Sequence, residues 1–233
     1  MNNISFINNT CKSLYGGGSG LQFKGISQTD FINCKFINNN AKQDTLMSRP
    51  TKELNKNYYN GDGGGIQICT MNDIHVYFQQ CLFKNNRAFR HGGAIAIQTI
   101  ADIRIFQCIF ENNKANCYSE TSSLELLIEN HFDKKTDGRG GAIYINPSYT
   151  YDDSSLSCSS PKEIFMSKVQ VEECEFNKNN GYDGYAFYIE GDDVDTKFLI
   201  TNNNFIDNYN KSNHNENENI IYGAVITTEI FTI

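Results

Sequence analysis

Residues 81–97 read Cys-Leu-Phe-Lys-Asn-Asn-Arg-Ala-Phe-Arg-His-Gly-Gly-Ala-Ile-Ala-Ile and contain two elements that recur along the chain. The first element is a Phe followed three residues later by an Asn, and the second is a small-residue turn that opens an alternating apolar strand. Side chains alternate between the two faces of a strand, so Cys81 and Phe83 share one face, as do Ile95 and Ile97. The stretch therefore predicts two short strands with a corner between them.

The Phe element is present in six copies that keep the same spacing. The copies are Phe6/Asn9, Phe36/Asn39, Phe83/Asn86, Phe110/Asn113, Phe176/Asn179 and Phe205/Asn208. A cysteine stands two residues before four of these phenylalanines, at Cys34, Cys81, Cys108 and Cys174. Further upstream, apolar residues alternate in a shifted phase, as in Ile103/Ile105, which predicts a separate first strand and a bend before the Phe element.

The glycine element is clearest over residues 18–23, 63–68, 92–97 and 140–145, with weaker copies over 184–189 and 222–227. Glycines such as Gly64, Gly93 and Gly141 permit a positive φ or a close backbone approach at a corner. With the strand that follows this turn, each repeat contains three short strands. That number is typical of a triangular solenoid.

A single repeat cannot bury its inward residues, whereas repeats stacked about 4.8 Å apart place like residues on like residues. We therefore predict an all-β fold, a right-handed parallel β-helix of about six rungs that forms one domain over residues 1–233. Phe and Cys are expected to form internal ladders. The Asn side chains are expected to bridge the backbones of successive rungs.

Four insertions lengthen the repeats relative to the shortest one, which runs from Phe83 to Phe110. They cover residues 42–61, 116–137, 147–165 and 209–221, and three of them lie between a Phe element and a glycine element. Insertions on one side of a solenoid usually mark the face that binds. The competing interpretation is that they are neutral expansions of an Asn-rich chain.

Charge and chain ends limit the function classes. The formal net charge is -7, and Lys and Arg show no basic stripe along the sequence, so nucleic-acid binding is not expected.

There is no apolar stretch long enough for a membrane helix and no signal peptide after Met1. Both ends of the stack would be uncapped, so we expect a piece of a longer protein whose membrane attachment, if any, depends on other regions.

Catalytic and metal-binding constellations are not recognisable, and no cofactor is expected. Outward positions on the second strands are Lys35, Leu82, Ile109, Glu175 and Asn204; on the third strands they are Gln22, Gln67, Ala96, Tyr144, Tyr188 and Ile226. Neither set contains the carboxylate cluster that a polysaccharide lyase or hydrolase needs. Isolated polar groups are interpreted as surface or turn residues: Asp152-Asp153, Asp192-Asp193, Asp73/His75, Arg90-His91, and Arg104 without acidic company.

The chain contains eight cysteines and no Cys-x-x-Cys motif, so a zinc site is not expected. Cys81 and Cys108 should stack on adjacent rungs, but side chains in a parallel ladder point the wrong way for an unstrained disulfide. Buried reduced thiols are the favoured interpretation. Cys117 and Cys158 lie in insertions and are better disulfide candidates if the protein is secreted.

Tyr144 and Tyr188 occupy equivalent outward positions on two third strands. Stacked exposed aromatic rings can bind a sugar face or a partner protein, so this pair is a candidate binding site. The alternative is that an insertion covers both rings.

The paired signatures Phe-x-x-Asn and Gly-Gly-Ala-Ile resemble the polymorphic outer membrane protein repeat family of chlamydial autotransporters. This resemblance covers nearly all of the chain outside the insertions. It implies a pectin-lyase-like β-helix at the cell surface with a role in adhesion, whose partner is a host or neighbouring cell-surface protein or glycan. Two alternatives stay open, namely a polysaccharide-active enzyme of the pectin-lyase type and an intracellular scaffold.

Overall fold

The computed structural model describes residues 1–12, 19–23, 28–42, 62–69, 74–99, 101–115, 138–146, 168–181, 184–189 and 197–208. The named elements in this part of the chain are all strands, and all of their pairings are parallel. Strands that are neighbours in a sheet come from successive repeats. The predicted parallel β-helix is confirmed.

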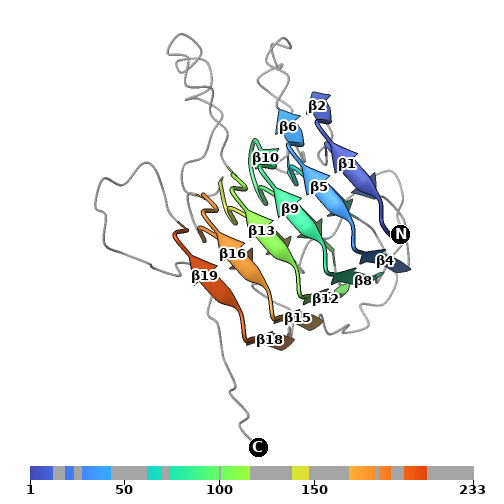
Figure 1. Ribbon diagram of the computed structural model, residues 1–233, viewed down its shortest axis with the longest axis vertical. Helices are drawn as coiled ribbons and strands as arrows, with labels where there is room; N and C mark the ends of the chain where they lie inside the picture. Colours follow the sequence, from blue (N-terminus) through green and yellow to red (C-terminus); the bar gives the residue numbers. More distant parts are fainter. Residues whose placement is uncertain are drawn as a thin grey trace, which may run out of the picture.

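Four sheets line the stack. Sheet A contains β4 (Gln28–Ile32), β8 (Ile74–Gln79), β12 (Ala101–Phe106), β15 (Lys168–Glu172) and β18 (Lys197–Thr201). Sheet B contains β1 (Ser5–Ile7), β5 (Lys35–Ile37), β9 (Leu82–Lys84), β13 (Ile109–Glu111), β16 (Glu175–Asn177) and β19 (Asn204–Ile206). Figure 1 shows the strands of sheet B side by side, with the colour running from blue to red along the stack.

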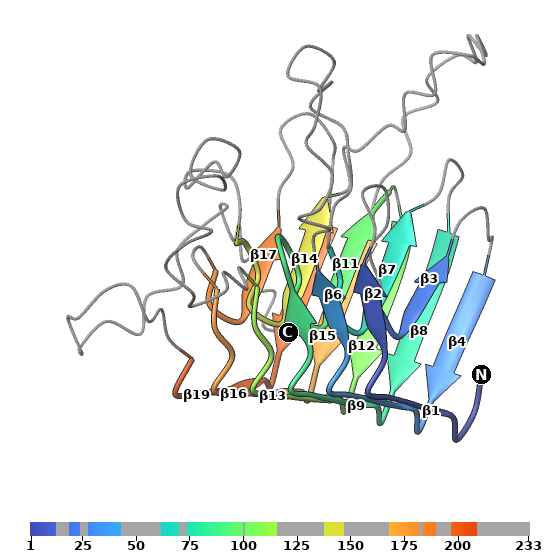
Figure 2. The same ribbon diagram turned by 90° about the horizontal axis from the view of Figure 1, so that it is seen from above.

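Sheets C and D complete the turn. Sheet D contains β3 (Leu21–Phe23), β7 (Ile66–Cys69), β11 (Ile95–Gln98), β14 (Ile143–Asn146) and β17 (Phe187–Ile189). Sheet C contains the short strands β2 (Thr10–Lys12), β6 (Asn40–Lys42) and β10 (Arg87–Ala88). Figure 2 shows the same succession of rungs from above. The expectation of three strands per rung is therefore wrong in the first rungs, because backbone pairing resumes for two or three residues after the asparagine corner.

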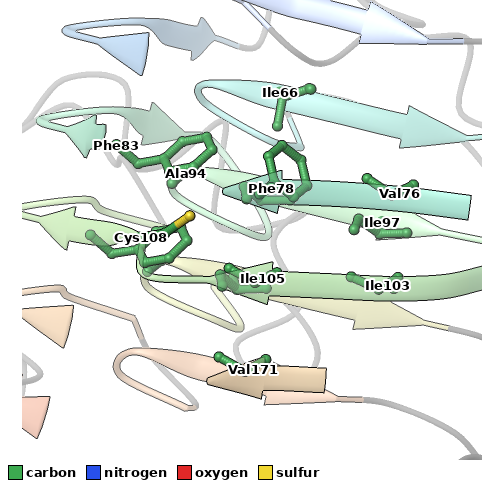
Figure 3. Close-up of a cluster of buried hydrophobic side chains, with 14 of the residues drawn as sticks. Ile66, Val76, Phe78, Phe83, Ala94, Ile97, Ile103, Ile105, Cys108 and Val171 are labelled. Atoms are coloured by element: carbon green, nitrogen blue, oxygen red, sulfur yellow. The ribbon is translucent and has the colours of Figure 1, made fainter. Parts of the chain in front are cut away.

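The core is a set of ladders inside the stack. Phe83 and Phe110 are 0% exposed, and their ring centroids lie 4.8 Å apart with nearly parallel planes. Figure 3 shows Phe78 and Phe83 among the buried aliphatic side chains and Cys108. The same stacking continues to both ends of the column, although Phe6 is half-buried and Phe205 in the last described rung is 42% exposed. The inward assignment of the phenylalanines is confirmed for the inner rungs.

Two corners place non-glycine residues in the left-handed region. The corner between sheets A and B has φ values near +50° at Asn3, Asn33, Gln80, Gln107, Glu173 and Asn202. The corner after sheet B has similar values at Asn8, Asn38, Asn85, Asn112, Lys178 and Asp207. Asn tolerates this conformation better than other residues with a Cβ. Much of the asparagine content thus has a conformational cause.

The Asn of each inner Phe element bridges rungs as predicted. Asn86 is fully buried, and its Oδ1 accepts hydrogen bonds from the backbone N–H of Asn39 at 3.1 Å and from Asn39 Nδ2 at 2.9 Å. Its own Nδ2 donates to the carbonyl of Phe36 at 2.8 Å and to Asn113 Oδ1 at 3.0 Å. Side-chain amides therefore satisfy backbone groups that the corner removes from the strand ladder.

The amide ladder begins, among the described residues, at Asn9. This side chain is only half-buried, whereas Asn39 on the next rung is 0% exposed. The backbone N–H of Asn9 donates to Asn39 Oδ1 at 3.1 Å, and Asn9 Nδ2 donates to the same oxygen at 2.9 Å. Among the described residues, Asn9 thus has a ladder neighbour on one side only. Asn9 is therefore the first described member of the ladder, and no described rung covers its other side.

Glycine is required where the chain turns into sheet D. Gly92 has a φ of +62°. A Cβ on Gly93 would lie 2.1 Å from the carbonyl oxygen of Gly141 on the next rung. Gly64 and Gly141 make equally close approaches to their neighbouring rungs. The predicted role of these glycines is confirmed.

The described cysteines are free thiols, and Cys34, Cys81, Cys108 and Cys174 are buried. These thiols form hydrogen bonds in addition to packing in the core. For example, the Cys108 thiol donates to the carbonyl of Phe106 at 3.4 Å. Burial raises the pKa of the Cys108 thiol well above its ordinary value, with smaller contributions from Cys174 and Cys81. The thiol is therefore protonated and able to donate at neutral pH. Cys117 and Cys158 lie outside the described residues.

Candidate functional site

A groove of about 700 Å³ follows the outer face of sheet A. Side chains alternate between the two faces of β8 and β12, so Val76 and Ile103 point into the core. His75, Tyr77 and Arg104 point outward. Among the residues that line the groove, the outward polar and aromatic ones are Gln28, Asp30, His75, Tyr77, Asp102, Arg104, Phe106, Gln170 and Glu172. The parallel register arranges them in rows across the strands.

Asp102 organises the charges in this groove. Its Oδ2 lies 3.3 Å from His75 Nδ1 on the preceding rung and 3.7 Å from Arg104 Nη2 on the same strand. The expectation that Arg104 has no acidic company is wrong, because residues two apart on a strand point to the same face. His75 also has an acidic partner, but that partner is Asp102, and Asp73 lies outside the described residues.

The groove carries three carboxylates, Asp30, Asp102 and Glu172. They were not predicted, because the outward positions named from the sequence for a carboxylate cluster lie on the second and third strands. The alternation of the first strands was the signal that could have revealed them. Within the described ranges, no group of three or more His, Cys, Asp or Glu residues could hold a metal ion. Tyr77 and Phe106 add ring surface, so the groove can hydrogen-bond and stack with a sugar or a peptide.

The outer face of sheet D differs from the prediction of an exposed surface. The predicted outward residues are in register, since Tyr188 pairs with Tyr144, and Tyr144 pairs with Ala96. However, Ala96 is 0% exposed and Tyr144 only 3%. The proposed pair of exposed rings is therefore wrong for Tyr144, and Tyr188 is half-buried.

The Tyr144 ring lies within an aromatic and cationic stack. Its centroid is 4.4 Å from the His91 ring and 6.1 Å from the Tyr188 ring. The Arg139 guanidinium lies 4.9 Å from the centroid of Tyr188. These contacts occupy ring surface that an exposed tyrosine pair would offer to a ligand. We therefore assign Tyr144 to packing.

A buried polar cluster lies beside this stack. Asp62 is 0% exposed and accepts hydrogen bonds at 3.1 Å from the backbone N–H of His91 and from Gln98 Nε2. His91 Nδ1 accepts the backbone N–H of Arg139 at 3.3 Å. Burial, together with the charges of Arg90 and Arg139, holds the pKa of His91 well below its ordinary value. His91 is thus a turn residue, as the sequence predicted, and its neutral imidazole joins two rungs.

The bases of three insertions share one corner. Asn40 pairs with Arg87 and Arg87 with Lys114, so the backbone just before residues 43–61 and 116–137 stacks in register. Asn208 Oδ1, just before the last insertion, accepts the backbone N–H of Asn179 at 2.9 Å. Lys42 ends β6, so the first insertion begins one residue later than predicted. The interiors of all four insertions, with Asp152-Asp153, lie outside the described residues, as do Asp192-Asp193.

Residues 107–146 match the family model of the Chlamydia polymorphic membrane protein repeat, a range that contains Phe110/Asn113 and the Gly140-Gly141-Ala142-Ile143 turn. Neither a curated protein nor a solved structure matches the chain significantly. In the part of the chain that the structure describes, no helix is long and apolar enough to cross a membrane.

Proposed function

We propose that the chain is a non-catalytic cell-surface or secreted scaffold for adhesion, because residues 107–146 match the Chlamydia polymorphic membrane protein repeat. Its corner insertions would contact a protein or glycan on a host or neighbouring cell. The observation that supports this proposal is the common corner of the insertion bases, where Lys114 and Arg87 pair on successive rungs.

Hydrogen bonds between successive rungs hold the stack together beneath that corner. The backbone N–H of Arg87 donates to the Asn39 carbonyl at 2.8 Å, and that of Lys114 donates to the Asn86 carbonyl at 2.9 Å. The amide ladder adds side-chain bonds at the same level. A rigid base lowers the entropy cost of presenting segments to a partner, which suits a scaffold with irregular insertions.

Replacing residues 43–61 and 116–137 with short turns tests this role. The purified chain, coupled to fluorescent beads, is counted on monolayers of cultured epithelial cells, and circular dichroism reports the fold. We expect an unchanged β-type spectrum and loss of attachment. Replacing residues 147–165, which leave the stack at a different corner, should keep attachment. Undiminished attachment after the first replacement would contradict the proposal and direct attention to the sheet A groove and Tyr188.

A polysaccharide lyase or hydrolase is the second candidate, favoured by Asp30, Asp102 and Glu172 in one groove beside Arg104. Incubation with pectate, alginate and glucans, with and without Ca²⁺, separates the two functions. We expect no unsaturated or reducing ends. Turnover that is lost in Asp102→Asn, but kept in the control Glu175→Gln on sheet B, would establish the enzyme.

A further inference from the structure

A second concave surface of about 530 Å³ lies at the corner between sheets B and C. Figure 1 labels β10, one of the strands that meet at this corner. Its lining combines three cations with side-chain amides: Asn38, Asn39, Asn40, Asn85, Arg87, Asn112, Asn113, Lys114, Lys178 and Asn180. We call Arg87, Lys114 and Lys178 the basic strip. These three cations form no stripe along the sequence, but stacking of the rungs brings them to one surface.

The basic strip runs along the axis of the stack. Arg87 pairs with Lys114, and Lys114 pairs with Asn180, on successive rungs. Lys178 stands two residues before Asn180, in the left-handed position of the same corner. The three cations therefore occupy three consecutive rungs, with a rise of about 4.8 Å per rung. Arg87 and Lys178 are exposed and Lys114 is half-buried.

The charge at this corner has the opposite sign to the net charge of the chain. The formal net charge is -7, yet the described residues that line the surface include no acid. The nearby carboxylate of Glu111 already pairs with Lys84 Nζ at 2.9 Å. Asp207 follows Lys178 in the column of left-handed residues and marks the end of the strip. The net negative charge of the chain repels anions, whereas the basic strip attracts them.

The amides at this corner provide neutral hydrogen-bond donors beside the cations. Asn85 Nδ2 donates to Asn38 Oδ1 at 3.1 Å, and Asn38 Nδ2 donates to Asn8 Oδ1 at 3.0 Å. Each amide has two N–H groups, so one bond along the column leaves a second N–H per side chain for a ligand oxygen. The same corner can therefore contact charged and uncharged oxygens in alternation.

We propose that the basic strip binds an extended sulfated polysaccharide. Cations on three consecutive rungs suit a chain with repeated anionic groups better than they suit one isolated phosphate. The interleaved amides suit the hydroxyl and carbonyl oxygens of sugars. The choice of a sulfated glycan rests on the proposed surface role, since such glycans occur outside cells, whereas the choice of a polyanion rests on the geometry alone.

Heparin binding by the full chain tests the proposal, measured by titration calorimetry at several salt concentrations. The variant Arg87→Gln/Lys114→Gln/Lys178→Gln should bind heparin about 10-fold more weakly or worse, because each exposed ion pair contributes modestly. The salt dependence of the Kd should also become shallower, since fewer counterions are exchanged. The control Lys35→Gln/Lys168→Gln/Lys197→Gln removes the same charge from other exposed positions and should bind like the parent.

Several outcomes would overturn the proposal. They are no heparin binding by the parent at low salt, equal weakening in both triple variants, or binding to desulfated heparin or polyphosphate as tight as to heparin. Should the strip variant lose the cooperative unfolding of the parent, Arg87→Lys and Lys178→Gln replace it. The first should bind like the parent and the second more weakly. The strip residues lie outside the replaced insertions, so loss of cell attachment with intact heparin binding separates the two proposals.

Discussion

Asn203 Oδ1 accepts the backbone N–H of Cys174 at 2.9 Å, and Cys174 Sγ accepts the backbone N–H of Cys108 at 3.4 Å in the same way. Both side chains also donate a hydrogen bond to a backbone carbonyl. Asn203 Nδ2 donates to the Val171 carbonyl at 2.7 Å, and Cys174 Sγ donates to the Ile105 carbonyl at 3.6 Å. Cysteine and asparagine therefore perform one task in this column, which is to satisfy a backbone pair between rungs.

This equivalence predicts how Cys174 can be replaced. Cys174→Asn should change the free energy of unfolding by less than about 1 kcal/mol, because the amide supplies both an acceptor and a donor. Cys174→Ala leaves the buried N–H of Cys108 without its acceptor and should cost about 1–3 kcal/mol. Urea denaturation under reducing conditions measures both. An alanine variant more stable than the asparagine variant would show that the thiol only fills space.

Removal of a buried ladder amide should be more costly. Asn86→Ala deletes the acceptor of the Asn39 N–H and the donor to the Phe36 carbonyl, and we expect a loss of about 3 kcal/mol or more. The neighbouring Asn85 is the matched control, since it is half-buried and has a φ of +55°. Asn85→Gly should be nearly neutral because glycine adopts that conformation freely. Equal losses in Asn86→Ala and Asn85→Gly, measured by chemical denaturation, would contradict the ladder.

The phenylalanine column predicts a gradient from the middle of the stack to its end. Phe83→Ala and Phe110→Ala should each cost about 3–5 kcal/mol, because each removes a ring stacked on both sides. Phe205→Ala should cost less, since that ring is 42% exposed. Lys35→Ala, on the exposed face, should stay within about 0.5 kcal/mol of the parent. Thermal and urea unfolding would refute the inward assignment if Phe83→Ala were as stable as Lys35→Ala.

Stability should fall on mild acidification because of His91. Its folded-state pKa is held well below the ordinary value by burial, and secondarily by Arg90 and Arg139, whereas the unfolded chain protonates near pH 6.5. Above that pH both states hold a neutral imidazole and this contribution is constant. Below it the unfolded state binds a proton that the folded state does not, so the free energy of unfolding falls by up to about 1.4 kcal/mol per pH unit.

Urea titrations between pH 7.5 and pH 5 measure this slope. His91→Gln should flatten it, because glutamine offers an acceptor to the Arg139 N–H without a titrating ring. An identical slope in His91→Gln and the parent would assign the acid sensitivity to other groups.

Local features of the sequence predicted the ladders. The Phe-x-x-Asn spacing, the alternation in Ile95/Ile97 and the double glycine are each contained within a few residues, and each dictates a strand face or a turn. The repeats share one pattern, so they stack with equivalent residues aligned, because only that register buries every inward side chain at once. The left-handed corners were not predicted, although the residue preceding the ladder Asn was a readable signal at Asn38, Asn85 and Asn112.

The outward surfaces depend on which residues the stack brings together across rungs. Arg87 and Lys178 are distant in the sequence and become neighbours of Lys114 only because the intervening segments return the chain to one register. The His75–Asp102 contact has the same origin. Tyr144 has the outward pattern of an exposed residue, and its burial comes from packing against His91 and its surroundings on the outer face. Periodicity determines which side of a strand a residue occupies, whereas exposure and charge partners are properties of the assembled stack.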